Sequence, residues 1–337
     1  MIDLLKKLTS VFAVADDYEE IRDVIIKEIE ETVDEYWCDN LGNLIAVKHG
    51  IHHRSGKKIM LTANMNTSGV MATHILNNGL IKIAPIGINN VVNLYGQKVA
   101  FKNGVPGVII GNEKNIENKH FFQNLFVDIG SGSKDETESL IKVFSMAMFL
   151  NNPIIIGNKI LSKYLDNMIG CSVLIKLIKE IESIENDTYF VFTSQDVSNI
   201  RSMITAAYQI RPDIIIRINT VAADVIEEVD RRKVEINHGP VIKVFDKEMF
   251  CHPIIREHLE ESAGIENLSC QYDISKIEIN YYNGVHTMFD GILTGNLSIP
   301  CKHKGSPFEM ICIDDAVIAI KILRNFINRL DKISYKI

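Results

Sequence analysis

Four apolar runs in this sequence are each followed by a short polar segment. The segments carry carboxylate, amide or imidazole groups, the kinds that bind metals and transfer protons. They are Asn64-Met65-Asn66, Gln195-Asp196, Asn219-Thr220 and Cys301–Ser306. In open α/β sheets, ligand sites form outside the carboxyl ends of the strands. If the apolar runs are strands of one sheet, the polar segments meet at that edge.

A fifth polar segment, Leu165-Asp166-Asn167, precedes an apolar stretch with helical periodicity at Cys171–Ile184. Asp166 is placed either to cap that helix or to act as a ligand from its N-terminus. Taken alone, each of the five segments also has the composition of an ordinary turn or cap. The spacing by itself therefore predicts a soluble α/β protein and no particular reaction.

The first part of the chain has the pattern of helices followed by strands. Apolar residues recur at helical spacing through residues 3–36, with acidic residues between them, and predict two amphipathic helices. Turn-forming residues at 39–43 precede an expected strand at Leu44–Val47. Another strand is expected at Lys57–Ala63, directly before Asn64.

The pattern changes between about residues 70 and 157, where Gly and Asn become frequent. Short β-like runs replace the helices there, at Lys98–Phe101, Gly107–Ile110 and Leu125–Ile129. We interpret residues 68–158 as a smaller β-rich domain inserted into a larger one formed by residues 1–67 and 159–337.

Alternation of strands and helices resumes after residue 158. Strands are expected at Tyr189–Thr193, Asp213–Asn219, Val241–Phe245 and Asn296–Ile299. Helices are expected at Ile200–Tyr208, 253–263 and 314–330. This order is typical of an α/β sheet covered by helices on both faces.

Composition excludes several classes of protein. The chain has 337 residues, of which 46% are apolar, and no apolar run approaches the ~20 residues needed to cross a bilayer. A net charge of −7 argues against broad nucleic-acid binding. The six cysteines are scattered, and the N-terminus lacks the long apolar region of a secretory signal. We therefore expect a cytoplasmic protein with reduced thiols.

Segments in the same order and at matching separations resemble the glutamyl/tetrahedral aminopeptidase family of dinuclear-metal peptidases. The segment 39–46 (DNLGNLIA) resembles the family signature D-x-L-G-N-L-I-A, and 60–69 (MLTANMNTSG) is similar to M-L-x-A-H-M-D-E-I-G. The other similar segments are 84–87 (APIG), 104–109 (GVPGVI), 127–130 (VDIG), 163–171 (KYLDNMIGC), 192–201 (FTSQDVSNIR), 298–300 (SIP) and 306–310 (SPFEM). The match spans nearly the whole chain.

The resemblance implies a three-layer α/β/α, phosphorylase/hydrolase-like peptidase domain with an inserted barrel-like β-rich domain. The family consists of cytoplasmic enzymes that remove N-terminal residues from peptides, and its subunits assemble into dimers and hollow dodecamers. A pair of zinc or cobalt ions activates a bridging water in these enzymes. Their ligands are two His and three carboxylates, and a Glu beside the metals is the general base.

Most of these roles fall here on side chains that cannot perform them. The first His ligand corresponds to Asn64, and the Asp that orients it corresponds to Asn66. Asp166 matches the bridging carboxylate, and the Asp after it corresponds to Asn167. The general-base Glu corresponds to Asp196, which is one methylene shorter. The other ligand positions correspond to Val197, Asn219 and Gly305.

This replacement removes most of the charge that holds two divalent cations. Val197 and Gly305 offer no side-chain ligand, and the amides Asn64 and Asn219 are neutral oxygen donors that suit zinc poorly. Moving the base back by one methylene displaces it by about 1 Å, which is serious for proton transfer. We therefore expect no tightly bound metal, and a degenerate homologue that binds peptides or acts as an oligomeric scaffold.

Three alternatives remain open from the sequence. An active aminopeptidase with a rebuilt single-metal site would use Asp166, Asp196 and His303, with or without His286. The old cleft would otherwise bind another small ligand. Cys171 lies where a helix N-terminus favours a thiolate, but the family also has a Cys there for packing, so a core role is the simpler interpretation.

Overall fold

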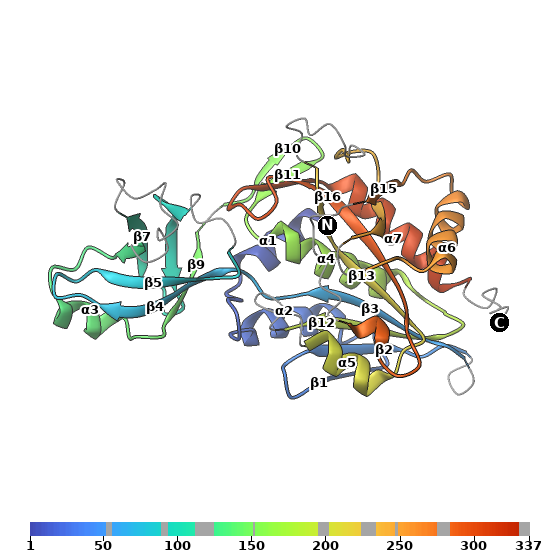
Figure 1. Cartoon of the computed structure of the whole chain (residues 1–337), viewed down its shortest axis with the longest axis horizontal. Helices are drawn as coiled ribbons and strands as arrows, with labels where there is room; N and C mark the ends of the chain where they lie inside the picture. Colours follow the sequence, from blue (N-terminus) through green and yellow to red (C-terminus); the bar gives the residue numbers. More distant parts are fainter. Residues whose placement is uncertain are drawn as a thin grey trace.

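The computed structural model describes residues 1–51, 56–88, 94–111, 125–150, 152–194, 202–223, 234–246, 249–274 and 284–329. The segment 195–201, which includes Asp196 and Val197, lies outside the described residues. Within them the chain forms a large mixed sheet flanked by helices and a separate closed barrel (Figure 1).

The main sheet has eleven strands. Nine of them form a continuous path, in the order β1 (Glu35–Cys38), β2 (Leu44–Lys48), β12 (Asp187–Thr193), β3 (Lys58–Asn64), β13 (Ile214–Ala222), β16 (Leu293–Lys302), β17 (Glu309–Cys312), β11 (Lys159–Ser162) and β10 (Ile154–Ile156). Beside this path, β14 (Val241–Phe245) pairs with β16 and with β15 (Gln271–Ile274).

The centre of the sheet is parallel, so the carboxyl ends of its strands meet at one edge. β3 pairs in parallel with both β12 and β13, and β13 pairs in parallel with β16. Thr193 is level with Asn64, and Asn219 is level with Ser298. The burial of nearly every residue in these four strands explains their continuous apolar runs, because helices cover both faces.

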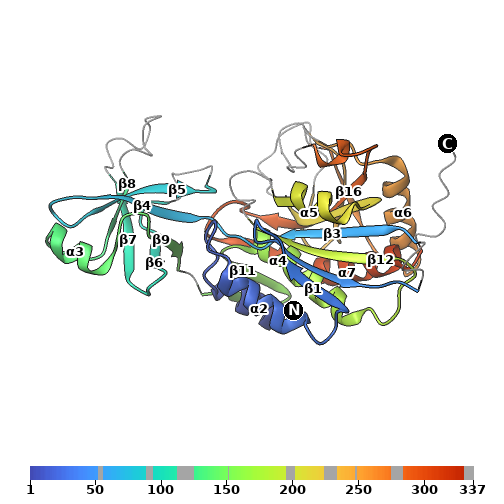
Figure 2. The ribbon, with the colours of Figure 1, turned by 90° about the horizontal axis from the view of Figure 1, so that it is seen from below.

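Seven helices are described, and six of them flank the main sheet, on both of its sides (Figure 2). α4 (Leu165–Glu180) packs on β3 and β13, and contacts α1 (Ile2–Ser10), α2 (Glu19–Ile29) and α7 (Ile313–Ile327). α5 (Ser202–Ile210) contacts β12 and β3 from the opposite side, and α6 (Pro253–Gly264) packs beside α7. The seventh helix, α3, belongs to the barrel.

One glycine sets how closely α4 approaches the sheet. A Cβ built on Gly170 would lie 2.5 Å from the carbonyl oxygen of Ile218 and 3.0 Å from Cβ of Ala63. The helix therefore rests on the backbone of β13 through a position that tolerates no side chain. Asp166 lies one turn earlier on the same helix.

The second unit is a closed barrel of six strands (Figure 1). Its order is β4 (Gly69–Ile75), β5 (Ile81–Ile86), β8 (Leu125–Asp128), β7 (Pro106–Gly111), β6 (Lys98–Phe101) and β9 (Met146–Phe149), and α3 (Lys134–Leu140) lies beside it. The first and last strands pair with each other through Val70↔Ala147 and Met71↔Met146. Chain entry and exit therefore lie side by side.

Several local predictions were wrong. α2 ends at Ile29, and residues 35–38 form strand β1 rather than the end of a helix. α4 begins at Leu165 instead of Cys171, so Asp166 lies in the first turn, and the N-cap position belongs to Tyr164. The helix α3 was not expected. β10, at 154–156, pairs with β11 of the main sheet rather than with barrel strands.

The predicted fold class is confirmed: an α/β domain with helices on both faces of a mixed sheet accompanies a β-barrel. Of the helices in the described part of the chain, none combines the length and apolarity needed to span a membrane.

Candidate functional site

The polar strand ends predicted to meet do meet, as far as the described residues show. Asn64 ends β3, while Asn219 and Thr220 lie near the end of β13, two and three residues beyond the Arg217↔Thr62 pair. The first turn of α4 brings Asp166 to the same edge, where its carboxylate accepts a hydrogen bond from the Thr220 hydroxyl.

A lysine lies against Asp166. Lys304 Nζ donates a hydrogen bond of 2.7 Å to the backbone oxygen of Thr220 and lies 3.6 Å from Asp166 Oδ1. The two side chains are 24% and 32% exposed, so this ion pair is only partly screened by water. Lys304 belongs to the turn after β16 that also carries His303 and Gly305.

Glu309 connects that turn to α4. Its Oε2 accepts from the Asp166 N–H at 2.8 Å and its Oε1 from the Gly305 N–H at 2.9 Å. Burial, followed by the nearby Asp166 charge, raises the pKa of Glu309 to about 8, although the two N–H donors favour the carboxylate. Burial and the N–H donors therefore act in opposite directions on the charge of Glu309 beside Asp166.

The three asparagines at Asn64, Asn66 and Asn167 bond to backbone and to each other. Asn64 Oδ1 accepts from the Asn66 N–H at 2.9 Å, and Asn167 Nδ2 donates to the Asn66 carbonyl at 2.5 Å. Asn66 Nδ2 donates to the Ala15 carbonyl. Asn66 Oδ1 is buried, and among the described residues it has no donor. By the resemblance, residue 66 corresponds to the Asp that orients the first His ligand, and residue 64 corresponds to that His. Here residue 64 is Asn, which has no ring N–H to donate to residue 66.

The remaining ligand positions are also engaged or lack a donor. Asn219 Oδ1 lies 2.8 Å from the Ser298 hydroxyl. Gly305 is exposed, has a φ of +76° and offers no side chain. His303 lies two residues earlier on the same turn, with a φ of +57° and an exposed side chain.

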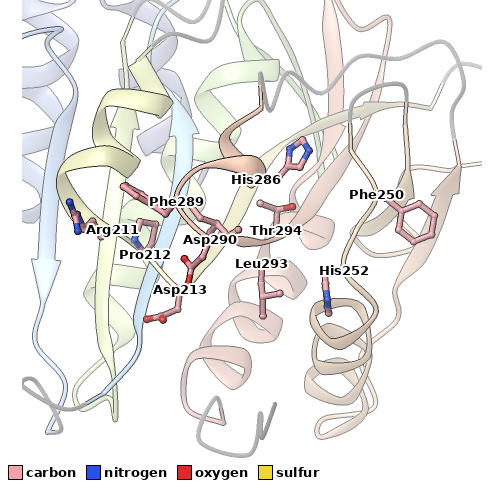
Figure 3. Close-up of a pocket in the computed structure, with 12 residues that line it drawn as sticks. Arg211, Pro212, Asp213, Phe250, His252, His286, Phe289, Asp290, Leu293 and Thr294 are labelled. Atoms are coloured by element: carbon pink, nitrogen blue, oxygen red, sulfur yellow. The ribbon is translucent and has the colours of Figure 1, made fainter. Parts of the chain in front are cut away.

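His286 lies at the other end of the sheet, so a rebuilt site that combines it with Asp166 is wrong. Its backbone oxygen accepts from the Ile292 N–H, just before β16 begins. Leu293 and Ile299, the partner of Thr220, are separated by six residues of β16, or roughly 20 Å. His286 lines a cavity of about 790 Å³ together with Asp213, His252 and Phe289 (Figure 3).

Of the predicted site residues, His286 alone is among the described residues that line this cavity. Figure 3 shows it with His252, Asp213 and Phe289 among the lining side chains. Arg211 stacks on the Phe289 ring, with 5.2 Å between guanidinium carbon and ring centroid. We therefore assign the candidate site to the carboxyl edge of the strands.

Cys171 has a packing role, as the simpler interpretation predicted. Its side chain is fully buried, and the thiol donates to the Asn64 carbonyl at 3.2 Å. Burial raises the pKa of the Cys171 thiol, which disfavours the thiolate that a nucleophile needs.

The donors at this edge do not fit a pair of divalent cations. Asp166 brings one negative charge and faces an ammonium, while the oxygen atoms of Asn64 and Asn219 are neutral and already in contact with donors. In the residues that the structure describes, no group of three or more His, Cys, Asp or Glu side chains is arranged to hold a metal. Zinc sites need several anionic or imidazole donors within about 2.3 Å.

The buried Lys163, near the site, is expected to make the stability of the folded protein depend on pH. It is 2% exposed, donates to the Phe149 carbonyl, and burial lowers its pKa from 10.5 to about 7. The unfolded chain then binds more protons between about pH 7 and 10.5, so stability rises with pH through that window. We expect K163M to remove a slope of up to about 1.4 kcal/mol per pH unit.

Urea unfolding of K163M and the parent between pH 7 and 9 measures this slope. The matched control is K98M, which changes an exposed lysine of β6. If the two variants have the same pH dependence, Lys163 does not carry the effect.

Sequence reasoning gave no individual role to three residues at the site. Glu309 was only part of a motif similar to the family's, and Thr220 and Lys304 were only members of the polar segments Asn219-Thr220 and Cys301–Ser306. Lys304 lies between His303 and Gly305 in a segment already identified as polar, so its type was visible. The direction of the Lys304 side chain toward Asp166 was not visible in the sequence. It depends on the left-handed backbone of His303 and Gly305, on either side of Lys304.

Comparisons with known proteins agree with this architecture. The profile described as M42 glutamyl aminopeptidase matches residues 42–322. A putative aminopeptidase from Acetivibrio thermocellus is 39% identical over 324 residues, covering 96% of this chain and 97% of that protein. The solved aminopeptidase APDkam598 from Desulfurococcus kamchatkensis has a TM-score of 0.91 at 28% identity, with 97% and 94% of the two chains covered.

A third match shows the fold alone. The TET1 peptidase of Pyrococcus horikoshii, described as able to assemble into a tetrahedron or a large octahedral shell, has a TM-score of 0.85 at 24% identity. The alignment covers 97% of this chain and 99% of that one.

Proposed function

Because this chain belongs to the M42 glutamyl aminopeptidase family, we propose that it is a degenerate member that has lost metal-dependent peptide hydrolysis. The observation that carries the proposal is the donor set around Asp166. Of the five ligand positions inferred from the resemblance, Asp166 alone keeps a carboxylate or imidazole, and that carboxylate faces Thr220 and Lys304. Asn64, Val197, Asn219 and Gly305 take the other four positions, with Asn66 and Asn167 in supporting ones.

The general base is weakened as well. Asp196 takes the position of the family's Glu and, by sequence, is one methylene shorter. A rebuilt single-metal enzyme would need Asp166, Asp196 and His303 to act together without His286. What such a protein keeps is the fold, so we propose that it binds peptides without cleaving them or serves as an oligomeric scaffold.

Metal analysis of protein purified without chelator tests the loss of hydrolysis, beside aminopeptidase assays with added Zn²⁺, Co²⁺ and Mn²⁺. We expect less than about 0.1 metal ion per chain, since the donors lack the charge that zinc sites need. We also expect no metal-dependent turnover above that of the matched D166N variant. Two metals per chain, or turnover that D166N abolishes, contradicts the proposal.

We also propose that the chain self-associates, with β10 as part of the interface. β10 lies at the end of the strand path, and Ile154, Ile155 and Ile156 are 53%, 37% and 50% exposed. Three successive exposed isoleucines on an edge strand are a typical site for pairing with another chain. The shells formed by TET1 support a second copy of this chain as the partner.

Sedimentation measures the effect of two charges on one face of this strand. We expect I154K/I156K to lower the assembly state, because both side chains lie on the same face and a buried lysine disfavours the contact. V317K, which changes a 40% exposed apolar residue of α7, is the matched control. A parent protein that sediments as a monomer of 38.0 kDa at micromolar concentration argues against self-association.

We further propose that the barrel is a domain, residues 68–158, inserted into a larger domain formed by residues 1–67 and 159–337. The barrel strands run from Gly69 to Phe149 and close on themselves, which supports independent folding. Circular dichroism of an excised 68–150 segment tests this, and a random-coil spectrum contradicts it. The six cysteines form no disulfide with one another, which supports a reducing, cytoplasmic location that cell fractionation tests.

A further inference from the structure

The ammonium of Lys304 has a defined place at the site. It donates to the Thr220 backbone oxygen at 2.7 Å and lies 3.6 Å from Asp166 Oδ1, the carboxylate that also accepts from the Thr220 hydroxyl. Thr220 thus contacts both members of the ion pair. The pair lies at the carboxyl edge of the central strands, where the family's metals are expected.

The turn that carries Lys304 is held in place from both sides. The Gly305 N–H donates to buried Glu309, which also accepts from the N–H of Asp166, and the Ser306 N–H donates to the His303 carbonyl at 3.0 Å. The lysine backbone and the first turn of α4 are therefore fixed to the same carboxyl group. The closeness of Lys304 and Asp166 therefore results from the hydrogen bonds to Glu309 as well as from the attraction between their opposite charges.

We propose that Lys304 is the built-in counter-cation of this site. Its single positive charge takes the place of the charge that metal ions supply in the family, and it excludes divalent cations from Asp166. A cation bound to Asp166 would lie about 2.0–2.3 Å from the carboxylate oxygen. An ammonium 3.6 Å from the same oxygen would then repel it at short range. The inference rests on the proposed loss of the metal pair. It adds that the charge of Lys304 is one reason why a metal ion does not bind at Asp166.

Removing the charge of Lys304 is the direct test. We expect K304M to bind Mn²⁺ about tenfold more tightly than the parent, because Mn²⁺ accepts carboxylate and carbonyl oxygens and the repulsive charge is gone. K302M removes the same charge two residues earlier and is the matched control. Binding is measured by the Mn²⁺-dependent rise in melting temperature, and the added D166N change in K304M/D166N is expected to abolish the gain.

A second variant guards against loss of the turn. K304Q keeps a donor for the Thr220 carbonyl but removes the charge, and we expect it to bind Mn²⁺ as K304M does. If neither K304M nor K304Q binds Mn²⁺ more tightly than K302M, the inference is overturned. Stoichiometric metal and peptidase activity in the parent protein would instead overturn the proposed function, so the two failures are distinguishable.

Discussion

Gly170→Ala is expected to lower the free energy of unfolding by about 2–3 kcal/mol, and Gly170→Leu by more than about 4 kcal/mol. A Cβ at this position would lie 2.5 Å from the Ile218 carbonyl oxygen, a backbone atom within β13 that cannot move alone. Either α4 shifts away from the sheet or β13 deforms. Because Asp166 lies one turn earlier on α4, the contact with Thr220 is expected to loosen as well.

Urea denaturation of the two Gly170 variants measures this loss, with G264A as the matched control. Gly264 ends α6, and a Cβ there has nothing within 4 Å, so the change is expected to be neutral or stabilising by up to about 1 kcal/mol. Equal effects of G170A and G264A would show that close packing of α4 is not the cause.

The second large effect is expected from restoring the metal ligands together. The variant combines N64H, V197E, N219D and G305H with K304M, and we expect it to bind about two zinc or cobalt ions per chain. Single restorations are expected to bind none tightly, since each leaves at least three positions without a suitable donor. N64H also places a ring N–H close to Asn66 Oδ1, a buried acceptor that has no donor among the described residues.

The comparison that isolates Lys304 uses the same four restorations with the lysine kept. That variant is expected to bind metal more weakly than the fivefold one, because the ammonium stays 3.6 Å from the Asp166 carboxylate. The G305H change itself has room, since a Cβ there meets nothing within 4 Å, but its φ of +76° costs about 1 kcal/mol. Calorimetric titration with Zn²⁺ provides the measurement. A folded fivefold variant that binds no metal contradicts the placement of the ligand positions.

Much of the fold was predictable because the central strands are buried on both faces. The expected strand at Val241–Phe245 has the observed bounds, and the run before Asn64 is displaced by one residue. Prediction failed after α2, where Val33 continues the helical spacing but the backbone does not. The Thr32 hydroxyl donates to the Ile29 carbonyl, and the Asp34 N–H donates to Val47 of β2. Strand pairing with a distant segment overrides the local pattern.

At the site, the sequence showed which residue types had been replaced but not how the remaining ones face. Lys302 ends β16, and His303 and Lys304 follow it on the turn; the spacing of these three consecutive polar residues gives no direction for any of them. The left-handed conformations of His303 and Gly305 determine that Lys304 reaches Asp166. For His286 the residue type was suitable for a ligand, but the sequence did not show that it lies at the end of β16 far from Asp166.

The pairing of β4 with β9 has a consequence for how the chain folds. Without the barrel, the main domain would have to bring Asn66 and Asn167 together across a disordered loop of roughly 100 residues. Closing such a loop costs about 2 kcal/mol more entropy than closing one of ten residues. Once β4 and β9 pair, the chain re-emerges beside its point of entry, and the loop that remains is short. The folded barrel therefore lowers the entropy cost of closing the main domain. Variants that unfold the barrel are expected to slow the packing of α4 on the main sheet.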